Sequence, residues 1–182
     1  MALKPLKIRK PSVKHLLLNS LLFNPIWITE KRLIKYISGA ISSVAVQAGE
    51  KWVDIGCGSR PYEKLFPSGC YIGVDIEDSG RPVSMKAPDF FYDGKRLPFD
   101  AGSIDGILCT QVLEHVPNPD ALLSEIKRVL KPGGSLILSA PFLWEEHEEP
   151  YDFFRFTSFG FRELLMRSEL EVVSLQKTTG LL

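Results

Sequence analysis

Hydrophobic positions along the chain follow two periods, one typical of helices and one typical of buried strands. Apolar residues recur every three or four positions in 30–47, behind a potential N-cap at Thr29, and again after Asn118 and Pro119. A further helix is predicted to begin at Ser158. Short, nearly continuous apolar runs predict strands at 51–55, 70–76, 89–93, 103–110, 134–140 and 170–177. Strands that alternate with helices predict an α/β fold, a Rossmann-like, doubly wound, mainly parallel sheet flanked by helices.

The pattern predicts one folded domain at 29–182, preceded by a basic, Leu-rich N-terminal extension at 1–28. The extension superficially resembles a signal peptide, but Asn19, Asn24 and Pro25 interrupt its apolar run, and no small-residue cleavage site follows. Packing of this segment against its own domain is favoured, and contact with a membrane surface is the less favoured alternative.

Charge and cysteine usage narrow the class of protein. Lys plus Arg and Asp plus Glu both number 22, so no global field would attract nucleic acid. Cys57, Cys70 and Cys109 form no CxxC pair. This usage favours reduced thiols in a cytoplasmic protein over disulfides or a zinc site.

The segment "WVDIGCGSRPY" (52–62) carries the first chemical signal, because Gly56 and Gly58 allow a ligand to approach the backbone after the first strand. A dinucleotide-binding G-x-G-x-x-G would need glycine at position 61, where Pro61 stands. Asp54 would repel a pyrophosphate but suits a cationic group. Asp75, at the end of the second predicted strand, can accept both hydroxyls of a ribose. A ligand with a ribose, a positive charge and no phosphate is S-adenosylmethionine.

Several segments, in this order, resemble the class I S-adenosylmethionine-dependent methyltransferases, and more narrowly the methyltransferase type 11 group near the ubiquinone and menaquinone C-methyltransferases. They are "VDIGCGSRPY", "YIGVDI", "FFYDGKRLPF", "FDAGSIDGILCTQVLEHVPNPDALLSEIKRVLKPGGSLILSAPF" and "EEPYDFFRFTSFGFRELL". The resemblance covers about residues 30 to 178. It implies S-adenosylmethionine as cofactor and S-adenosylhomocysteine as product.

The resemblance also implies roles for individual residues in cofactor binding. The backbone of the first motif is expected to hold the methionine end, and residues of later motifs are expected to contact the ribose, the adenine and the methionine. These predicted cofactor-binding residues are Asp54, Gly56, Cys57, Gly58, Asp75, Ile76, Asp93, Gly94 and Gln111. Of these, Asp75 matches the ribose-binding acid, Ile76 is placed to pack on adenine, and Asp93 accepts from the adenine amino group. The sequence departs from many relatives at Arg60, where they have a third glycine, and its role stays open. The Cys57 and Cys109 side chains are expected to pack rather than to react.

The acceptor side is predicted from "QVLEHV" (111–116) and "WEEHEEPYDFFRF" (144–156), which follow the fourth and fifth strands. Methyl transfer needs alignment of the acceptor and, for a hydroxyl or activated carbon, a base. His147 is the favoured base and His115 the second. No metal site is expected, because the acids of "EEHEE" lack distant partner ligands.

The acceptor itself is predicted to be a small molecule rather than nucleic acid or protein. The fourth strand is followed by "TQVLEH" and not by the Asn/Asp-Pro-Pro-Tyr/Phe motif of enzymes that methylate amino groups of adenine, cytosine or glutamine. O- or C-methylation is favoured, and the resemblance suggests a glycan or lipid-linked precursor.

The chain ends soon after the sixth predicted strand, whereas class I methyltransferases usually add a seventh, antiparallel strand. We therefore expect the sheet to lack that strand, either because the sequence is a fragment or because a second chain covers the open edge as a dimer. Two alternative functions stay open, a cofactor-binding but non-catalytic domain that acts through partners and an NAD-dependent oxidoreductase.

Overall fold

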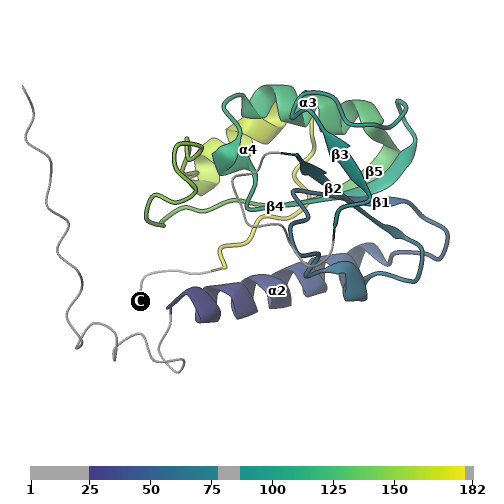
Figure 1. The fold of residues 1–182 in the computed structure, drawn as a ribbon, viewed down its shortest axis with the longest axis horizontal. Coiled ribbons are helices and arrows are strands. Elements are labelled where there is room, and N and C mark those ends of the chain that lie inside the picture. Colours follow the sequence, from purple (N-terminus) through teal and green to yellow (C-terminus); the bar gives the residue numbers. More distant parts are fainter. Residues whose placement is uncertain (1–24, 78–86, 179–182) are drawn as a thin grey trace, which may run out of the picture.

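The computed structural model describes residues 25–77 and 87–178, so most of the predicted N-terminal extension lies outside the described residues. A five-stranded sheet lies at the centre, with strand order β3-β2-β1-β4-β5 (Figure 1). Its strands are β1 (Trp52–Ile55), β2 (Tyr71–Ile76), β3 (Phe90–Tyr92), β4 (Ile104–Thr110) and β5 (Leu130–Ser139). All four strand pairs are parallel, which confirms the predicted fold class.

Helices cover the two faces of this sheet (Figure 1). They are α2 (Pro25–Val44), α3 (Pro119–Val129) and α4 (Ser158–Arg167), with single 3-10 turns η1 (Glu63–Leu65) and η2 (Leu113–His115). The predicted cap of α3 is confirmed, since the Asn118 side chain accepts a hydrogen bond from the N–H of Ala121. In the described part of the chain, no helix has the length and hydropathy needed to cross a membrane.

Two apolar clusters hold the layers together, one on each face of the sheet. On one face, Val53 and Ile55 of β1 pack with the apolar sides of α3 and α4. On the other face, Trp52 and Tyr71 pack with Ile37 and Ile41 of α2. The alternation of inward positions along β1 follows from the two-residue period of a strand.

Three predicted boundaries or elements are wrong. Helix α2 begins at Pro25 rather than after Thr29, because proline is well tolerated in the first turn of a helix. Strand β5 begins at Leu130 rather than at Gly134. The sequence predicts that residues 131–134 end the preceding helix, but they belong to β5 and run along β4 with a register shift. The sixth strand at 170–177 does not form.

The 170–177 segment instead packs as irregular chain. Leu170, Val172 and Leu175 lie against the apolar cluster of α3 and α4, while Val173 is exposed. Its apolar residues are therefore used for packing, but its backbone has no ladder with a neighbouring strand among the described residues. This leaves β5 as one edge of the sheet.

Strand order reverses at β1, which has β2 on one side and β4 on the other. In open parallel sheets, ligands bind at such a switch point, outside the carboxyl ends of the strands. The loops that follow β1, β2 and β4 therefore define the candidate site.

Candidate active site

The loop after β1 is built against β2. The backbone N–H groups of Gly56 and Cys57 donate to the Val74 carbonyl at 2.8 and 3.2 Å. Gly56 and Gly58 have φ of 69° and 48°, the left-handed region that favours glycine. A Cβ on Gly56 would lie 2.5 Å from Cγ2 of Val112, so close packing against the segment after β4 also requires glycine here.

Asp75 connects this loop to the end of β2. Its Oδ2 accepts a hydrogen bond from the N–H of Gly58 at 3.0 Å, and its Oδ1 accepts from the N–H of Ile76 at 2.9 Å. Ile76 is 38% exposed, and its Cγ2 lies 3.9 Å from the position of a Cβ on Gly94. Gly58, Asp75, Ile76 and Gly94, predicted from separate motifs, thus lie side by side.

Asp93 lies beside this group but is already engaged. Its Oδ1 accepts hydrogen bonds from the N–H groups of Lys95 and Arg96 at 2.9 and 2.8 Å, which lower the pKa of Asp93. One carboxylate oxygen therefore holds the turn that contains Gly94.

Asp54 is buried behind the glycine loop, with only 2% of its surface exposed. Its Oδ2 accepts a hydrogen bond from the Tyr71 hydroxyl, and its Oδ1 is buried without a partner among the described residues. Burial raises the pKa of Asp54 to about 7, although the Tyr71 hydrogen bond acts to lower it. A cationic group bound nearby would favour the ionised carboxylate, so this acid fits the positive charge of S-adenosylmethionine.

Arg60, whose role the sequence left open, holds the loop rather than pointing outward. Its guanidinium lies 2.9 Å from the Asp89 carboxylate, 3.3 Å from that of Glu63 and 5.1 Å from the centre of the Tyr71 ring. Asp89 in turn accepts a hydrogen bond from the N–H of Gly73 at 2.7 Å. The arginine thus ties the glycine loop to β2 and to the segment before β3.

Gln111 brings the end of β4 into the same region. It adopts φ of 54°, its N–H donates to the Ser139 carbonyl at 3.0 Å, and its Nε2 donates to the Ser139 hydroxyl at 3.1 Å. These bonds tie Gln111 to the end of β5. The next residue, Val112, contacts the glycine loop, as described above.

The cysteines of the site are packed, as expected. Burial raises the pKa of Cys57 to about 12 and also raises that of Cys109. Cys57 lies over Gly73, where a Cβ would come within 2.9 Å of its sulfur. Neither thiol has the lowered pKa of a nucleophile.

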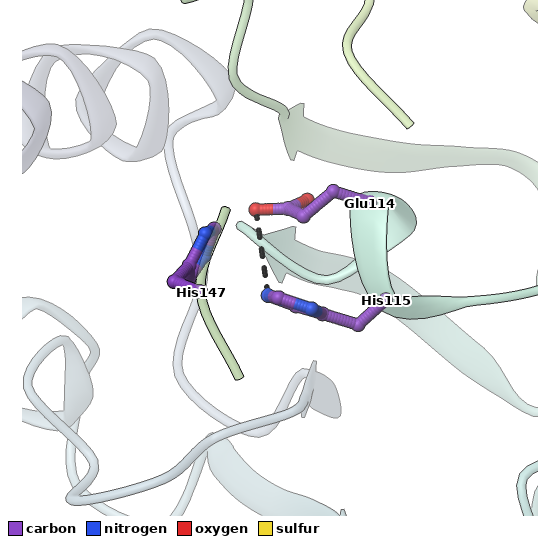
Figure 2. A group of neighbouring side chains, drawn as sticks. All are labelled: Glu114, His115 and His147. Carbon is purple, nitrogen blue, oxygen red and sulfur yellow. Dashed lines mark ion pairs between the residues drawn. The ribbon is translucent and has the colours of Figure 1, made fainter. Parts of the chain in front are cut away.

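The loop at 144–156, which the sequence predicts to lie on the acceptor side, folds onto η2. The N–H of Phe153 donates to the Glu114 carbonyl at 2.7 Å, and the rings of His115 and His147 meet edge to face with centres 4.8 Å apart. The two candidate bases, 32 positions apart in the sequence, are therefore neighbours (Figure 2). The same loop forms a hollow of about 280 Å³, whose lining residue Asp152 contacts His147. The hollow is lined by Trp144, Glu146, Asp152, Phe153, Phe154 and Arg155.

An ion pair inside this loop sets its shape. Both Asp152 carboxylate oxygens accept hydrogen bonds from Arg155, at 2.6 and 2.7 Å, and Oδ2 also accepts from the N–H of His147 at 2.9 Å. Arg155 holds the pKa of Asp152 well below its usual range. Arg155 also donates to the carbonyls of Trp144 and Glu145, which closes the loop on itself.

Glu114 lies in the predicted segment "QVLEHV" beside His115, but the sequence did not single it out for a role in the site. Its side chain is fully buried, and neither carboxylate oxygen has a hydrogen-bond partner among the described residues. Burial raises the pKa of Glu114 to about 7. The pattern "LEH" placed it next to His115, but no spacing signal distinguishes this acid from the exposed ones nearby.

Comparison with known proteins agrees with this fold and site. A family model described as "Methyltransferase domain" matches residues 53–138. The ubiquinone biosynthesis O-methyltransferase of Dechloromonas aromatica is 28% identical, over 64% of this chain and 53% of that protein. The demethylmenaquinone methyltransferase of Geobacillus stearothermophilus is 29% identical, over 83% of this chain and 72% of that protein.

Solved structures show the same architecture. A methyltransferase from Haloferax volcanii, in complex with the Trm112 methyltransferase activator, superposes with a TM-score of 0.59 and 25% identity. The match covers 77% of this chain and 69% of that one. The family model, the relatives and the solved structures together support a class I S-adenosylmethionine-dependent methyltransferase. It spans about half the length of most of the curated relatives it matches.

Proposed function

We propose that this protein transfers a methyl group from S-adenosylmethionine to a small-molecule acceptor. The observation that carries the proposal is the meeting, at the switch point of the sheet, of the Asp75 carboxylate, the Gly56–Gly58 turn and the buried Asp54. These groups match a ligand that combines a ribose with a positive charge. They do not match a pyrophosphate, because two carboxylates lie at the place where it would bind.

Each predicted cofactor residue has a proposed task in this arrangement. Asp75 would hold the ribose hydroxyls, Ile76 and Gly94 would border the adenine, and Gln111 with the glycine loop would hold the methionine end. Asp93 has one oxygen engaged in its turn, so its second oxygen would accept from adenine. When bound, S-adenosylmethionine supplies the methyl group on a sulfonium that makes it reactive.

The acceptor side would orient the acceptor and take its proton. His147 contacts Asp152, which lines the hollow of the loop at 144–156, and His147, with His115 in second place, would act as base for a hydroxyl or activated carbon. The aromatic side chains of this loop would exclude water. Matched relatives are named for O-methylation in ubiquinone biosynthesis, for thiol S-methylation and for C-methylation in ubiquinone and menaquinone biosynthesis, which supports a small organic acceptor. We propose a lipid-linked or glycan precursor as the class of acceptor.

A second candidate function is a cofactor-binding domain that acts through a partner chain. The open edge at β5 favours it, because an unpaired edge strand is a site for strand pairing, either with a second copy or with another protein. Turnover separates the two functions, since a binding domain would not accumulate S-adenosylhomocysteine with any acceptor.

The test begins with calorimetric titration of the chain with S-adenosylmethionine, S-adenosylhomocysteine and NAD. We expect binding of the first two and none of NAD. Turnover is then followed as release of S-adenosylhomocysteine with a panel of catechols, quinols, thiols and lipid-linked sugars. Preference for NAD would overturn the proposal, and binding without turnover over the whole panel would favour the second candidate.

A further inference from the structure

Glu114, His115 and His147 form a cluster of potential metal ligands, three of whose inner atoms have no hydrogen-bond partner among the described residues. One ligand atom from each of the three residues lies within 4.8 Å of those of the other two (Figure 2). Nε2 of His115 lies 3.9 Å from Oε1 of Glu114 and 3.7 Å from Oε2 of Glu148, too far for hydrogen bonds. Both oxygens of Glu114 and Nε2 of His115 are buried without a partner among the described residues.

The outer hydrogen bonds determine which nitrogens face the cluster with a lone pair. Nδ1 of His115 lies 2.6 Å from the Tyr151 carbonyl, which can only accept, so Nδ1 carries the proton and Nε2 of a neutral ring does not. Nδ1 of His147 lies 3.2 Å from both the Glu145 carbonyl and Oδ2 of Asp152, again acceptors. Each ring thus has its second nitrogen available as a ligand atom.

This arrangement matches the surroundings of metal-binding histidines. Such histidines donate their other N–H to a carboxylate or a backbone carbonyl, which orients the ring and raises its basicity. Asp152 supplies the carboxylate for His147, and its own bonds to Arg155 fix it in place. A fully buried carboxylate facing two imidazole lone pairs is unfavourable unless a proton or a metal cation lies between them.

We propose that Glu114, His115 and His147 bind a divalent transition-metal ion, with Zn²⁺ the best match. Two imidazoles and one carboxylate are the donor set of open, catalytic zinc sites, whereas Mg²⁺ prefers oxygen ligands alone. A tetrahedral ion with bonds of about 2.1 Å holds its ligand atoms roughly 3.4 Å apart. The His115–Glu114 distance of 3.9 Å therefore needs to contract by about 0.5 Å, and separations of up to 4.8 Å within the cluster by as much as about 1.4 Å. Glu148, which is part of the same ion-pair group, or water would complete the coordination.

Such an ion would lie where the acceptor is expected to bind, beside the hollow of the loop at 144–156. An acceptor hydroxyl bound to it would have a lowered pKa, because a Lewis acid stabilises the alkoxide or phenolate. The histidines would then hold the ion, and the proton of the acceptor hydroxyl would pass to solvent water; in the metal-free protein the histidines would take this proton themselves. The sequence predicts no metal site, because "EEHEE" has no partner ligands nearby in the sequence. In the fold, η2 brings Glu114 and His115 to His147.

The experiment uses the full chain, stripped with a chelator and titrated with Zn²⁺ by calorimetry, without cofactor or acceptor. We expect one Zn²⁺ per chain and a higher melting temperature with the metal. Glu114→Gln and His147→Gln should each weaken Zn²⁺ affinity at least tenfold, and Mg²⁺ should not compete. Matched controls are Glu145→Gln, an exposed acid of the same loop, and His15→Gln, the remaining histidine of the sequence, and both should bind as the native chain does.

Circular dichroism confirms that each variant is folded, and His115→Gln replaces any variant that is not. The proposal would be overturned if the native chain did not bind Zn²⁺, or if all three cluster variants bound Zn²⁺ as tightly as the native chain. Loss of binding in His15→Gln alone would also overturn it. Because no methyl transfer is measured, this result is independent of the proposed function.

Discussion

The carboxylate of Asp75, at the end of β2, accepts a hydrogen bond of 3.0 Å from the N–H of Gly58 in the loop after β1. The same carboxylate bonds to the N–H of Ile76 at 2.9 Å, so it is oriented by backbone on two sides. A side chain held in this way keeps its position without the ligand, which reduces the entropy lost when a ribose binds. Asp75 therefore both shapes the glycine loop and offers the predicted ribose contact.

Replacement Asp75→Ala should reduce affinity for S-adenosylmethionine and S-adenosylhomocysteine by about 100-fold or more. The reason is the loss of two charge-assisted hydrogen bonds, each contributing roughly 1.5 kcal/mol or more. Calorimetric titration measures the change. Asp105→Asn is the control, because Asp105 lies at the opposite, amino end of β4 and pairs with Lys131. Equal affinities of the native chain and Asp75→Ala would place the ribose elsewhere.

The buried Asp54 should make the ligand-free protein less stable as pH rises. Its pKa is raised to about 7, whereas an unfolded aspartate titrates near 4, so the folded state holds the extra proton between these values. Stability from this group therefore falls from about pH 4 to pH 7 and is constant above. An asparagine at this position cannot titrate, so the free energy of unfolding of Asp54→Asn relative to the native chain should rise by roughly 2 to 4 kcal/mol between about pH 4 and pH 7, at about 1.4 kcal/mol per pKa unit. Urea unfolding at several pH values measures this difference. A pH-independent difference between the two proteins would show that Asp54 is ionised throughout.

Two glycines should respond in opposite directions to replacement by alanine. A Cβ on Gly106 of β4 would come within 2.3 Å of the Trp52 ring, which is buried and cannot move freely. Gly106→Ala should therefore destabilise the fold by roughly 1 to 3 kcal/mol. Gly39, in the exposed part of α2, has nothing within 4 Å of its Cβ position, so Gly39→Ala should stabilise by about 0.5 to 1 kcal/mol. Thermal unfolding of both variants checks the pair, and a stable Gly106→Ala would mean that Trp52 can repack.

Elements with a strong local signal were predictable from the sequence. The capped helix at Asn118 and the first four strands follow from apolar period and cap chemistry, and they appear within about two residues of their predicted bounds. The segment at 170–177 has the same apolar character, but a strand also needs a neighbour with free hydrogen-bonding groups. That requirement belongs to the tertiary structure, so an apolar run alone predicted a strand wrongly.

One part of the candidate site could also be predicted from the sequence, and the other part could not. Asp75 and the glycines were found because parallel strands bring their carboxyl ends together, which is a rule of the fold. The cluster of Glu114, His115 and His147 depends instead on how one long loop folds back over η2. The bonds that set this loop, from Arg155 to Asp152 and from Phe153 to the Glu114 carbonyl, involve residue types that are common on any surface. No spacing in the sequence distinguishes them.

The ion pair of Asp152 with Arg155 should therefore matter more than a similar pair on the surface. Asp152→Asn leaves the Arg155 charge without its partner in a site where the carboxylate is only 3% exposed, and should cost about 2 kcal/mol at pH 7. Because the pKa of Asp152 is depressed, this contribution is fully present above about pH 4 and is lost as pH falls further. The matched control is Asp120→Asn, which breaks an equally short Asp120–Arg167 pair whose side chains are 47% and 55% exposed. That change should cost clearly less than Asp152→Asn, since solvent screens exposed pairs. Urea unfolding of both variants at pH 7 and pH 3 measures the contrast, and equal costs would show that the loop at 144–156 does not depend on its buried pair.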